Sequence, residues 1–392
     1  MYRLKGRIQP YAWGGNKFIP DLFHLKIENA ATTAEYWLGA HPGGITEVEI
    51  SEGKWTSLAG EIDAEKEFWL GKNIAQKFGR LPFLLKVLDV KDMLSIQVHP
   101  TKKAAEEGFK AENEKGIPLN APNRNYKDDN HKPEVMIALS EFWLLHGFAE
   151  NIDERLNQYS FLSPFKKNYQ SGGIKELYKT LMELSQVEVD ALLAPLADSI
   201  LPKYKQGLLK KSSPDFWAAR AFENLSKDGY DKGIFSIYLF NILRLEPGEG
   251  IFQGAGMPHA YLEGQNIELM SNSDNVLRAG LTPKYIDIPE LLKNTLFNIT
   301  KPNVIRAQQT RQQHFECPVP DFNITTYKLA AGEQQSILFH NPAILLLIKG
   351  NMMVSDGSIK KVSAAVAFYC IPGEKITIDA ESDLYFIVAS AD

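Results

Sequence analysis

The pattern of hydrophobic and polar positions is strand-like at both ends of the chain. Toward the N-terminus, residues 82–89 and 133–139 are largely apolar runs of strand length. Toward the C-terminus, residues 323–329 alternate between apolar and polar side chains, as a strand with one buried face does. Residues 343–348 and 365–371 are apolar runs between turn residues, which is typical of strands inside a sandwich or barrel.

Between the two strand-like parts lies a block with helical periodicity. Residues 174–184, 190–201 and 215–225 carry apolar side chains at the spacing of one helix face. Pro214 is well placed to begin the third helix, and Gly172-Gly173 should interrupt the chain before the first. We therefore predict a mainly β protein with a helical insertion.

Length and composition add a division into units. The chain has 392 residues, of which 44% are hydrophobic and 11% aromatic, so it can bury more than one core. We predict three units. Residues 1–150 and 244–300 form a first β unit, residues 151–243 form the helical unit, and residues 301–392 form a second β unit.

Charge and cysteine content exclude several classes of protein. The formal net charge of −5 gives no general attraction to nucleic acid or to a membrane surface. No apolar run approaches the roughly twenty residues that a membrane-spanning helix needs. The two cysteines, Cys317 and Cys370, lack a metal-binding spacing and are typical of buried thiols in a reducing compartment. We expect a cytoplasmic protein without a nucleic-acid or membrane partner.

Four polar residues in strand-like segments are candidates for a metal site. Along residues 94–99, a period of two places Gln97 and His99 on one face of the strand. Glu134 begins a second strand, and His259 follows a glycine-rich turn. Nitrogen ligands with one carboxylate suit zinc better than magnesium or calcium, and the absence of cysteine ligands favours an open, catalytic site.

Neighbouring residues suggest how this site could be extended. A hairpin between the strand that contains Lys86 and the strand that contains Gln97 would bring both side chains to one polar face. Lys132 lies two positions before Glu134, so the two side chains should point the same way. The polar stretch of residues 101–130 is too long for a plain β connection and is predicted to be a functional loop or lid.

The metal candidates resemble the two-part motif of cupin barrels, in which the ligands come from separated strands. Here Gln97 takes the place of a histidine of that motif, and Glu134 lies far downstream of His99. Longer segments over about the first three hundred residues resemble type I mannose-6-phosphate isomerases. They are Gln9-Pro10-Tyr11-Ala12-Trp13-Gly14, Ala34-Glu35-Tyr36-Trp37-Leu38-Gly39-Ala40-His41-Pro42, Pro82-Phe83-Leu84-Leu85-Lys86-Val87-Leu88, residues 94–100, Asn130-His131-Lys132-Pro133-Glu134 and residues 273–285.

This resemblance implies a fold and an activity. The fold would be a bicupin, with two jelly-roll barrels and an α-helical domain. The first β unit would be the catalytic cupin domain and residues 301–392 a cupin-like domain. The activity would be the zinc-dependent interconversion of D-mannose 6-phosphate and D-fructose 6-phosphate through an enediolate, with one Zn²⁺ per chain. The partner would be a small sugar phosphate, and the protein would be a monomer.

The resemblance also implies roles for particular residues. Gln97, His99, Glu134 and His259 fall on the four zinc-ligand positions of the family. The positions that match substrate-binding or catalytic residues are Arg278 for catalysis, Lys86, Ser95 and Arg278 for the phosphate, and His131, Lys132 and Asp274 for proton transfer. An aldose–ketose isomerase needs a base with a pKa near the working pH, which His131 has by nature and Lys132 could reach if buried. The choice between these two bases stays open.

Two other functions fit the same metal residues. A metal-dependent cupin oxygenase would use iron at the four positions, but Gln97 disfavours it. A non-catalytic sugar-binding bicupin would have little use for Arg278 and Lys132 beside a metal.

Overall fold

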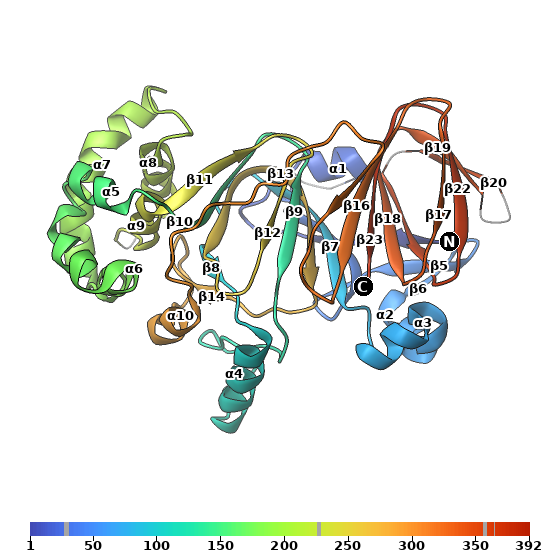
Figure 1. Cartoon of the computed structure of the whole chain (residues 1–392), viewed down its shortest axis with the longest axis horizontal. Helices are drawn as coiled ribbons and strands as arrows, with labels where there is room; N and C mark the ends of the chain where they lie inside the picture. Colours follow the sequence, from blue (N-terminus) through green and yellow to red (C-terminus); the bar gives the residue numbers. More distant parts are fainter. Residues whose placement is uncertain (27–30, 226–228, 356–358, 364) are drawn as a thin grey trace.

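Strands dominate the computed structural model, which describes residues 1–26, 31–225, 229–355, 359–363 and 365–392 (Figure 1). The helical block lies at one end of an elongated molecule and the C-terminal strands lie at the other end, with the strands that carry Gln97, Glu134 and His259 between them. The predicted fold class, mainly β with a helical insertion, is confirmed. None of the helices in the described ranges is long and apolar enough to cross a membrane.

The central sheet has eleven strands. They are β2 (Arg7–Gln9), β3 (Glu35–His41), β4 (Gly44–Ile45), β7 (Phe83–Val90), β8 (Gln97–Val98), β9 (Glu134–Ala138), β10 (Phe142–Phe148), β11 (Phe240–Leu245), β12 (Gly250–Gln253), β13 (His259–Ser271) and β14 (Leu277–Arg278). Strand β13 organises this sheet because its thirteen residues pair with β7, β8, β9 and β10. It therefore brings residues from separated parts of the sequence to one surface.

The predicted hairpin between the strands of Lys86 and Gln97 is wrong. Strand β7 pairs with β3 and β13, whereas β8 pairs with β13 and β14. The long strand β13 separates the two: Glu268 is the partner of Lys86, and His259, nine residues earlier, is the partner of Gln97. Both side chains nevertheless line one cavity, because they approach it from different parts of the same sheet.

The C-terminal unit consists of two antiparallel sheets. The eight-stranded sheet contains β15 (Gln312–Phe315), β16 (Asn323–Leu329), β23 (Leu384–Ser390), β18 (Ala343–Lys349), β21 (Val366–Cys370), β1 (Tyr2–Lys5), β5 (Glu47–Ser51) and β6 (Lys54–Ser57). The four-stranded sheet contains β17 (Gln334–Leu338), β22 (Lys375–Ala380), β19 (Asn351–Ser355) and β20 (Ile359–Ser363). The strands predicted at residues 323–329, 343–348 and 365–371 correspond to β16, β18 and β21.

Three strands near the N-terminus belong to this C-terminal sheet. Strand β1 pairs with β21, with Leu4 opposite Ala367, and also with β5, which pairs with β6. The prediction placed residues 1–150 in the first unit and did not foresee that β1, β5 and β6 join the sheet of the second. The boundaries at residues 150, 243 and 300 stay a prediction.

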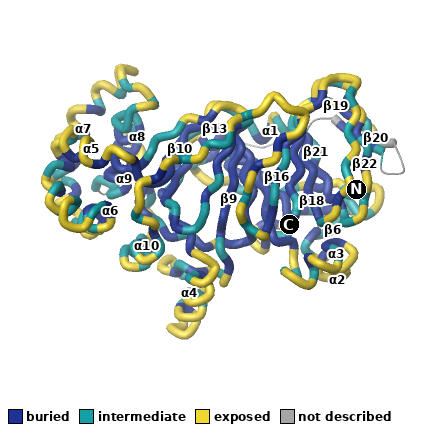
Figure 2. Tube along the Cα trace, viewed as in Figure 1, coloured by how far each residue is buried: buried dark blue, intermediate teal, exposed yellow. Residues whose placement is uncertain are grey.

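The two β units share a buried interface, which explains the continuous apolar runs in the sequence. In β7, Leu85 and Val87 belong to the same apolar cluster as Ile344 and Leu346 of β18. Lys86 lies between them in sequence and points to the opposite face, as the pleat of a strand requires. One face of β7 thus packs against the C-terminal unit and the other face lines the cavity. Figure 2 shows the buried residues concentrated in these central strands.

The helices flank the two β units. They are α1 (Phe18–Phe23), α2 (Leu58–Ala64), α3 (Lys66–Lys77), α4 (Lys102–Glu114), α5 (Ile152–Gln158), α6 (Lys166–Glu183), α7 (Gln186–Lys205), α8 (Pro214–Leu225), α9 (Gly233–Leu239) and α10 (Ile288–Asn294). The predicted helical block is confirmed: α8 begins at Pro214, and Gly173 kinks α6 with a φ of 63°. The block packs against β10 through aromatic side chains: Trp217 lies against Trp143, with ring centroids 6.0 Å apart, and Tyr178 lies against Phe148, with ring centroids 5.3 Å apart.

The stretch of residues 101–130, predicted to be a loop, contains the thirteen-residue helix α4. Thr101 caps its first turn, since its hydroxyl accepts a hydrogen bond from the amide of Ala104 at 3.2 Å. Three ion pairs at i, i+4 spacing run along its surface: Lys102–Glu106, Lys103–Glu107 and Lys110–Glu114. The loop prediction is wrong over this helix, because Phe109 is the only large apolar side chain among its thirteen residues and no apolar face stood out in the sequence. The role of the stretch as a lid stays a prediction.

Candidate metal centre and active site

His99, Glu134 and His259 meet at the buried face of the central sheet. The three offer ligand atoms that all lie within 4.8 Å of one another. Nε2 of His99 lies 3.4 Å from Glu134 Oε1, and Nε2 of His259 lies 3.3 Å from Glu134 Oε2. They come from the end of β8, the start of β9 and the start of β13. The sheet therefore brings together three residues that span 160 positions of the sequence.

Both imidazoles are held in the tautomer that a metal requires. Nδ1 of His99 is 2.9 Å from the carbonyl oxygen of Asn275, and Nδ1 of His259 is 2.9 Å from that of Met257. A carbonyl can only accept, so each Nδ1 carries the proton and each Nε2 presents a lone pair. Nε2 of His99 is fully buried and has no hydrogen-bond partner in the part of the chain that the structure describes. Such an orphaned nitrogen, aimed at a carboxylate and a second imidazole, fits a bound metal ion.

The electrostatic environment favours the protonation states that bind a cation. Burial, together with the nearby charge of Lys132, lowers the pKa of His99 to about 4. Burial alone would oppose ionisation of Glu134, but Lys132 and the two imidazoles outweigh it and hold the pKa of that carboxyl well below its usual range. At neutral pH His99 is therefore neutral and Glu134 is ionised, which are the forms that ligate a metal.

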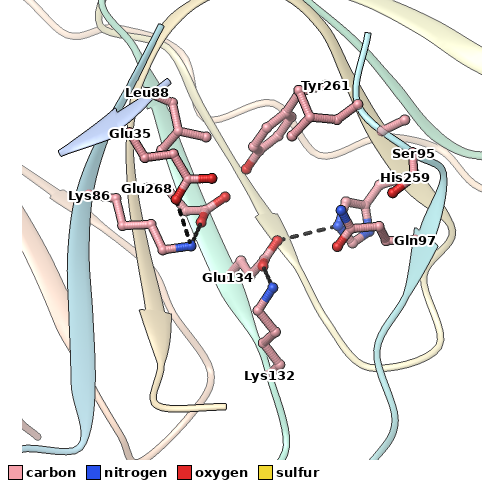
Figure 3. Close-up of a pocket in the computed structure, with 12 residues that line it drawn as sticks. Glu35, Lys86, Leu88, Ser95, Gln97, Lys132, Glu134, His259, Tyr261 and Glu268 are labelled. Atoms are coloured by element: carbon pink, nitrogen blue, oxygen red, sulfur yellow. Dashed lines mark hydrogen bonds and ion pairs between the residues drawn. The ribbon is translucent and has the colours of Figure 1, made fainter. Parts of the chain in front are cut away.

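Gln97 completes the set of four predicted ligands. In the ladder it lies opposite His259 of β13 on one side and Arg278 of β14 on the other. Its side chain lines the same cavity as Glu134 and His259, and Figure 3 shows Gln97 beside His259. The structure thus brings together all four residues that the sequence singled out for the metal.

Two buried lysines flank the metal cluster (Figure 3). Nζ of Lys132 lies 2.9 Å from Glu134 Oε1, which confirms that these side chains point the same way. Nζ of Lys86 lies 2.9 Å from Glu268 Oε1 and 3.6 Å from Glu35 Oε2. Burial would lower the pKa of Lys86, but Glu268 and Glu35 outweigh it and raise that pKa. Lys86 is therefore a buried ammonium whose charge two carboxylates already neutralise.

The sequence did not point to Glu35 or Glu268 as part of this cavity. Both are buried in strands that are otherwise apolar, Glu35 in β3 and Glu268 in β13. A charged residue within an apolar strand was the available signal, since burying a charge is costly unless it is paired. The partner could not be read from the sequence because Lys86 lies 182 residues from Glu268.

The metal cluster lies at the bottom of a larger cleft. The inner cavity, about 60 Å³, has room for an ion and a few water molecules. The outer cleft, about 860 Å³, could hold a sugar phosphate. Glu35, Leu94, Ser95 and Gln97 line both spaces, so one opens into the other.

The outer cleft carries a cluster of positive charges. Lys127, Arg278 and Lys284 all line it. Burial lowers the pKa of Lys284, and the charges of Arg278 and Lys127 lower it further, so both cations lie close enough to Lys284 to repel its charge. No carboxylate within the described ranges forms an ion pair with any of them. The carboxylates of Glu35, Asp92 and Asp274 also line the cleft. Cations that form no ion pair with them are suited to bind an anion.

The remaining predicted residues lie in different surroundings. Nε2 of His131 is 2.8 Å from Asp321 Oδ2, and His131 does not line either space, although the adjacent Lys132 lines the inner one. Asp274 lines the outer cleft, and its Oδ1 lies 3.6 Å from Nε2 of His41. Of the two candidate bases, the structure thus places Lys132, and not His131, in the cavity.

A metal cluster on the buried face of an antiparallel sheet, with residues from separated strands, defines a cupin-type metal site. Residues 1–151 match the family model of the phosphomannose isomerase type I catalytic domain. The chain is 37% identical over 367 residues to the mannose-6-phosphate isomerase of Escherichia coli K12, with 91% of each chain covered. The chain belongs to the mannose-6-phosphate isomerase family.

Solved structures agree with this assignment. The apo form of mannose 6-phosphate isomerase from Salmonella typhimurium superimposes with a TM-score of 0.88 at 32% identity, covering 100% of this chain and 99% of that one. A mannose 6-phosphate isomerase bound with zinc and yttrium superimposes with a TM-score of 0.84 at 33% identity, again covering 100% and 99%. The expected cupin fold is thereby confirmed.

Proposed function

We propose that this chain catalyses the zinc-dependent, reversible isomerisation of D-mannose 6-phosphate to D-fructose 6-phosphate. The observation that carries the proposal is the buried cluster of His99, Glu134 and His259 at the bottom of a cleft whose walls bear unpaired cations. The relatives named for this activity, which match over most of their length, support it.

Gln97, His99, Glu134 and His259 would hold one zinc ion per chain. The orphaned Nε2 of His99 and the ionised Glu134 fit this role, and the zinc-bound relative supports the choice of metal. When bound, zinc supplies a Lewis acid that stabilises negative charge on the oxygens of the sugar.

The phosphate is assigned to the outer cleft. Arg278 can donate two parallel hydrogen bonds to phosphate oxygens, and Lys127 and Lys284 add charge on the same wall. Ser95, which lines both spaces, can donate a further hydrogen bond. Lys86 is not assigned to the phosphate, because it lines only the inner cavity, whereas Arg278 and the two lysines line the outer cleft.

The isomerisation moves a proton between C2 and C1 of the sugar and needs groups that hold or transfer protons. Lys132 lies in the inner cavity beside Glu134. Its ammonium can give a proton to a sugar oxygen, and the neutral amine that remains can then accept the proton from carbon. Lys86, kept protonated by Glu35 and Glu268, can stabilise negative charge that develops on a sugar oxygen. We prefer Lys132 to His131 for this role, because the ring of His131 is hydrogen-bonded to Asp321 and does not line the inner cavity. Asp274, at the wall of the cleft, would orient the substrate.

The wider assignments follow the same reasoning. The catalytic cupin unit comprises residues 1–150 and 244–300, except for strands β1, β5 and β6, which belong to the C-terminal sheet. Residues 151–243 form the helical unit and residues 301–392 the cupin-like unit. We assign the protein to the cytoplasm as a monomer that acts on a small sugar phosphate, without a nucleic-acid or membrane partner.

The test is to incubate purified protein with mannose 6-phosphate and to follow fructose 6-phosphate and dissolved oxygen, before and after chelation. We expect fructose 6-phosphate to form without oxygen uptake, and we expect chelation to stop the reaction. Oxygen uptake would instead favour the cupin oxygenase. Tight binding of the sugar phosphate without turnover would favour the non-catalytic sugar-binding bicupin.

A further inference from the structure

A hydrogen-bonded joint lies beside the outer cleft, where the segment after α4 meets α10. Figure 1 shows α4 and α10 near each other below β8 and β14. We define the joint as residues 124–126 together with α10. The hydroxyl of Tyr126 donates to Glu290 Oε1 at 2.6 Å and accepts from Nδ2 of Asn294 at 3.2 Å. Nδ2 of Asn125 donates to Asp287 Oδ2 at 2.9 Å.

On its other side, the joint is tied to α4. The carboxylate of Glu112 in α4 accepts hydrogen bonds from the backbone amides of Asn125 at 3.1 Å and Tyr126 at 2.9 Å. Nε of Arg124 lies 2.9 Å from the same carboxylate, and the buried guanidinium also donates to carbonyl oxygens of its own segment. Residues 124–126 are therefore tied to α4 by several hydrogen bonds, whereas their contact with α10 consists of the side-chain hydrogen bonds of Asn125 and Tyr126.

Hydrogen bonds, more than apolar packing, set the position of α10 against this segment. A cavity of about 380 Å³ lies between them and is lined mainly by polar side chains, including Glu112, Asp287 and Glu290. The ring of Tyr126 is buried, with 2% of its surface exposed, so its hydroxyl has few alternative partners. Losing the Tyr126–Glu290 hydrogen bond should therefore loosen the joint without removing a core side chain.

Two of the lysines that line the outer cleft, Lys127 and Lys284, are attached directly to this joint. Lys127 follows Tyr126 in the sequence, and its backbone amide donates to Asn275 Oδ1 at 2.7 Å. Lys284 lies three residues before Asp287, which caps the N-terminus of α10. Since one lysine precedes α10 and the other follows the α4 segment, the joint fixes how far apart the two charges are.

We propose that this joint positions Lys127 and Lys284 for the phosphate of the substrate, so that Tyr126 and Glu290 are positioning residues that act from outside the cleft. The inference rests on the proposed function, because it takes the anion of the outer cleft to be a sugar phosphate. It predicts that a hydrogen bond remote from the metal controls phosphate affinity and has little influence on the chemical step.

The test compares Tyr126→Phe with a matched control, Tyr238→Phe. Tyr238 also donates to a carboxylate, Asp215 Oδ1 at 2.8 Å, but it lies in the helical block. We expect Tyr126→Phe to raise the KM for mannose 6-phosphate and the Kd for inorganic phosphate by about three- to tenfold, with kcat changed less than twofold. Tyr238→Phe should leave all three constants unchanged. An unchanged phosphate Kd in Tyr126→Phe would overturn the proposal.

A double-mutant cycle with Lys127→Ala separates positioning from a general structural effect. If Tyr126 acts through Lys127, then adding Tyr126→Phe to Lys127→Ala should raise the phosphate Kd by less than about twofold. The same factor in both backgrounds would show that Tyr126 acts independently of the lysine. Phosphate binding is measured by calorimetry without turnover, so a failure here is distinct from an absence of isomerase activity, which would refute the proposed function itself.

Discussion

The two β units are both built from antiparallel strands, but the interior of the central sheet contains charged side chains, whereas the interior of the C-terminal unit is apolar. In the central sheet, the side chains that face the cavity include four buried charged residues, Glu35, Lys86, Glu134 and Glu268. Between the sheets of the C-terminal unit, the corresponding space is filled by an apolar cluster. Its members include Tyr327, Leu345, Leu347, Met352, Val354, Phe368, Ile376, Ile378 and Phe386.

This difference indicates where function resides. A buried charge without compensation costs several kcal/mol, so a fold keeps such residues only where they are paired or bind something. The central sheet contains such buried charges around the inner cavity, where carboxylates, lysines and imidazoles lie together. The C-terminal interior has the composition of an ordinary core, and no histidine follows His340 in the sequence. We infer that the C-terminal unit stabilises the molecule, whereas the central sheet performs the chemistry.

The largest expected contrast comes from one histidine in each unit. His259→Ala should lose zinc and reduce kcat by on the order of a thousandfold or more, because the Lewis acid is lost with its ligand. The matched control is His314→Ala, which removes an exposed histidine from β15 of the C-terminal sheet. It should leave the zinc content and kcat unchanged. Zinc content and kcat are measured together. A zinc-free His259→Ala protein with normal kcat would contradict the assignment of the metal.

Arg278→Lys should have the next largest effect. It keeps the charge but loses the planar fork that can donate to the phosphate and to the developing oxyanion at once. We expect kcat to fall by roughly a hundredfold, with zinc content unchanged. Arg311→Lys, at an exposed ion pair with Glu333 in the C-terminal unit, is the control and should have no effect. Near-normal kcat in zinc-loaded Arg278→Lys would show that Arg278 is not part of the catalytic site.

Two lysine variants separate the inner cavity from the outer cleft. Lys86→Ala should lower kcat by about ten- to 150-fold, since it removes a charge-assisted contact, but should leave inhibition by inorganic phosphate unchanged. Lys284→Ala should raise the Ki for phosphate by about ten- to 150-fold, with a smaller change in kcat. Steady-state kinetics with phosphate as a competitive inhibitor measures both. If Lys86→Ala weakened phosphate inhibition instead, the sequence-based assignment of Lys86 to the phosphate would be restored.

The smallest expected effect on catalysis comes from the C-terminal core. Phe386 is fully buried and stacks on Tyr327, with ring centroids 4.7 Å apart. Phe386→Ala should lower the free energy of unfolding by about 3 to 5 kcal/mol, because it leaves a cavity. Below the unfolding transition, kcat and zinc content should stay normal. A large loss of kcat in the folded variant would mean that the C-terminal unit takes part in the chemistry.

Local sequence patterns predicted much of this architecture. Strands β16 and β18 and helix α8 carry strong signals, since alternation, apolar runs and Pro214 act within a few residues. The four metal candidates could also be found, because imidazoles and a carboxylate are uncommon in otherwise apolar strands. These predictions needed no knowledge of which strands are neighbours.

Features that depend on strand pairing could not be predicted in the same way. The pairing of β1 with β21 joins residues at opposite ends of the chain, and no local pattern specifies it. The contact between Lys86 and Glu268 likewise requires the register of β7 against β13. Without it, Lys86 was assigned to the phosphate from the resemblance alone. The orientation of His131 depended on Asp321, which lies 190 residues away.

The most direct test of the central claim is a zinc titration of the metal-free enzyme, with kcat for mannose 6-phosphate measured at each step. If the chemistry depends on the single cluster of His99, Glu134 and His259, activity should rise linearly and reach its maximum at one zinc ion per chain. His259→Ala should show no such rise. Full activity before any zinc is added, or a rise that continues well beyond one ion per chain, would contradict the account.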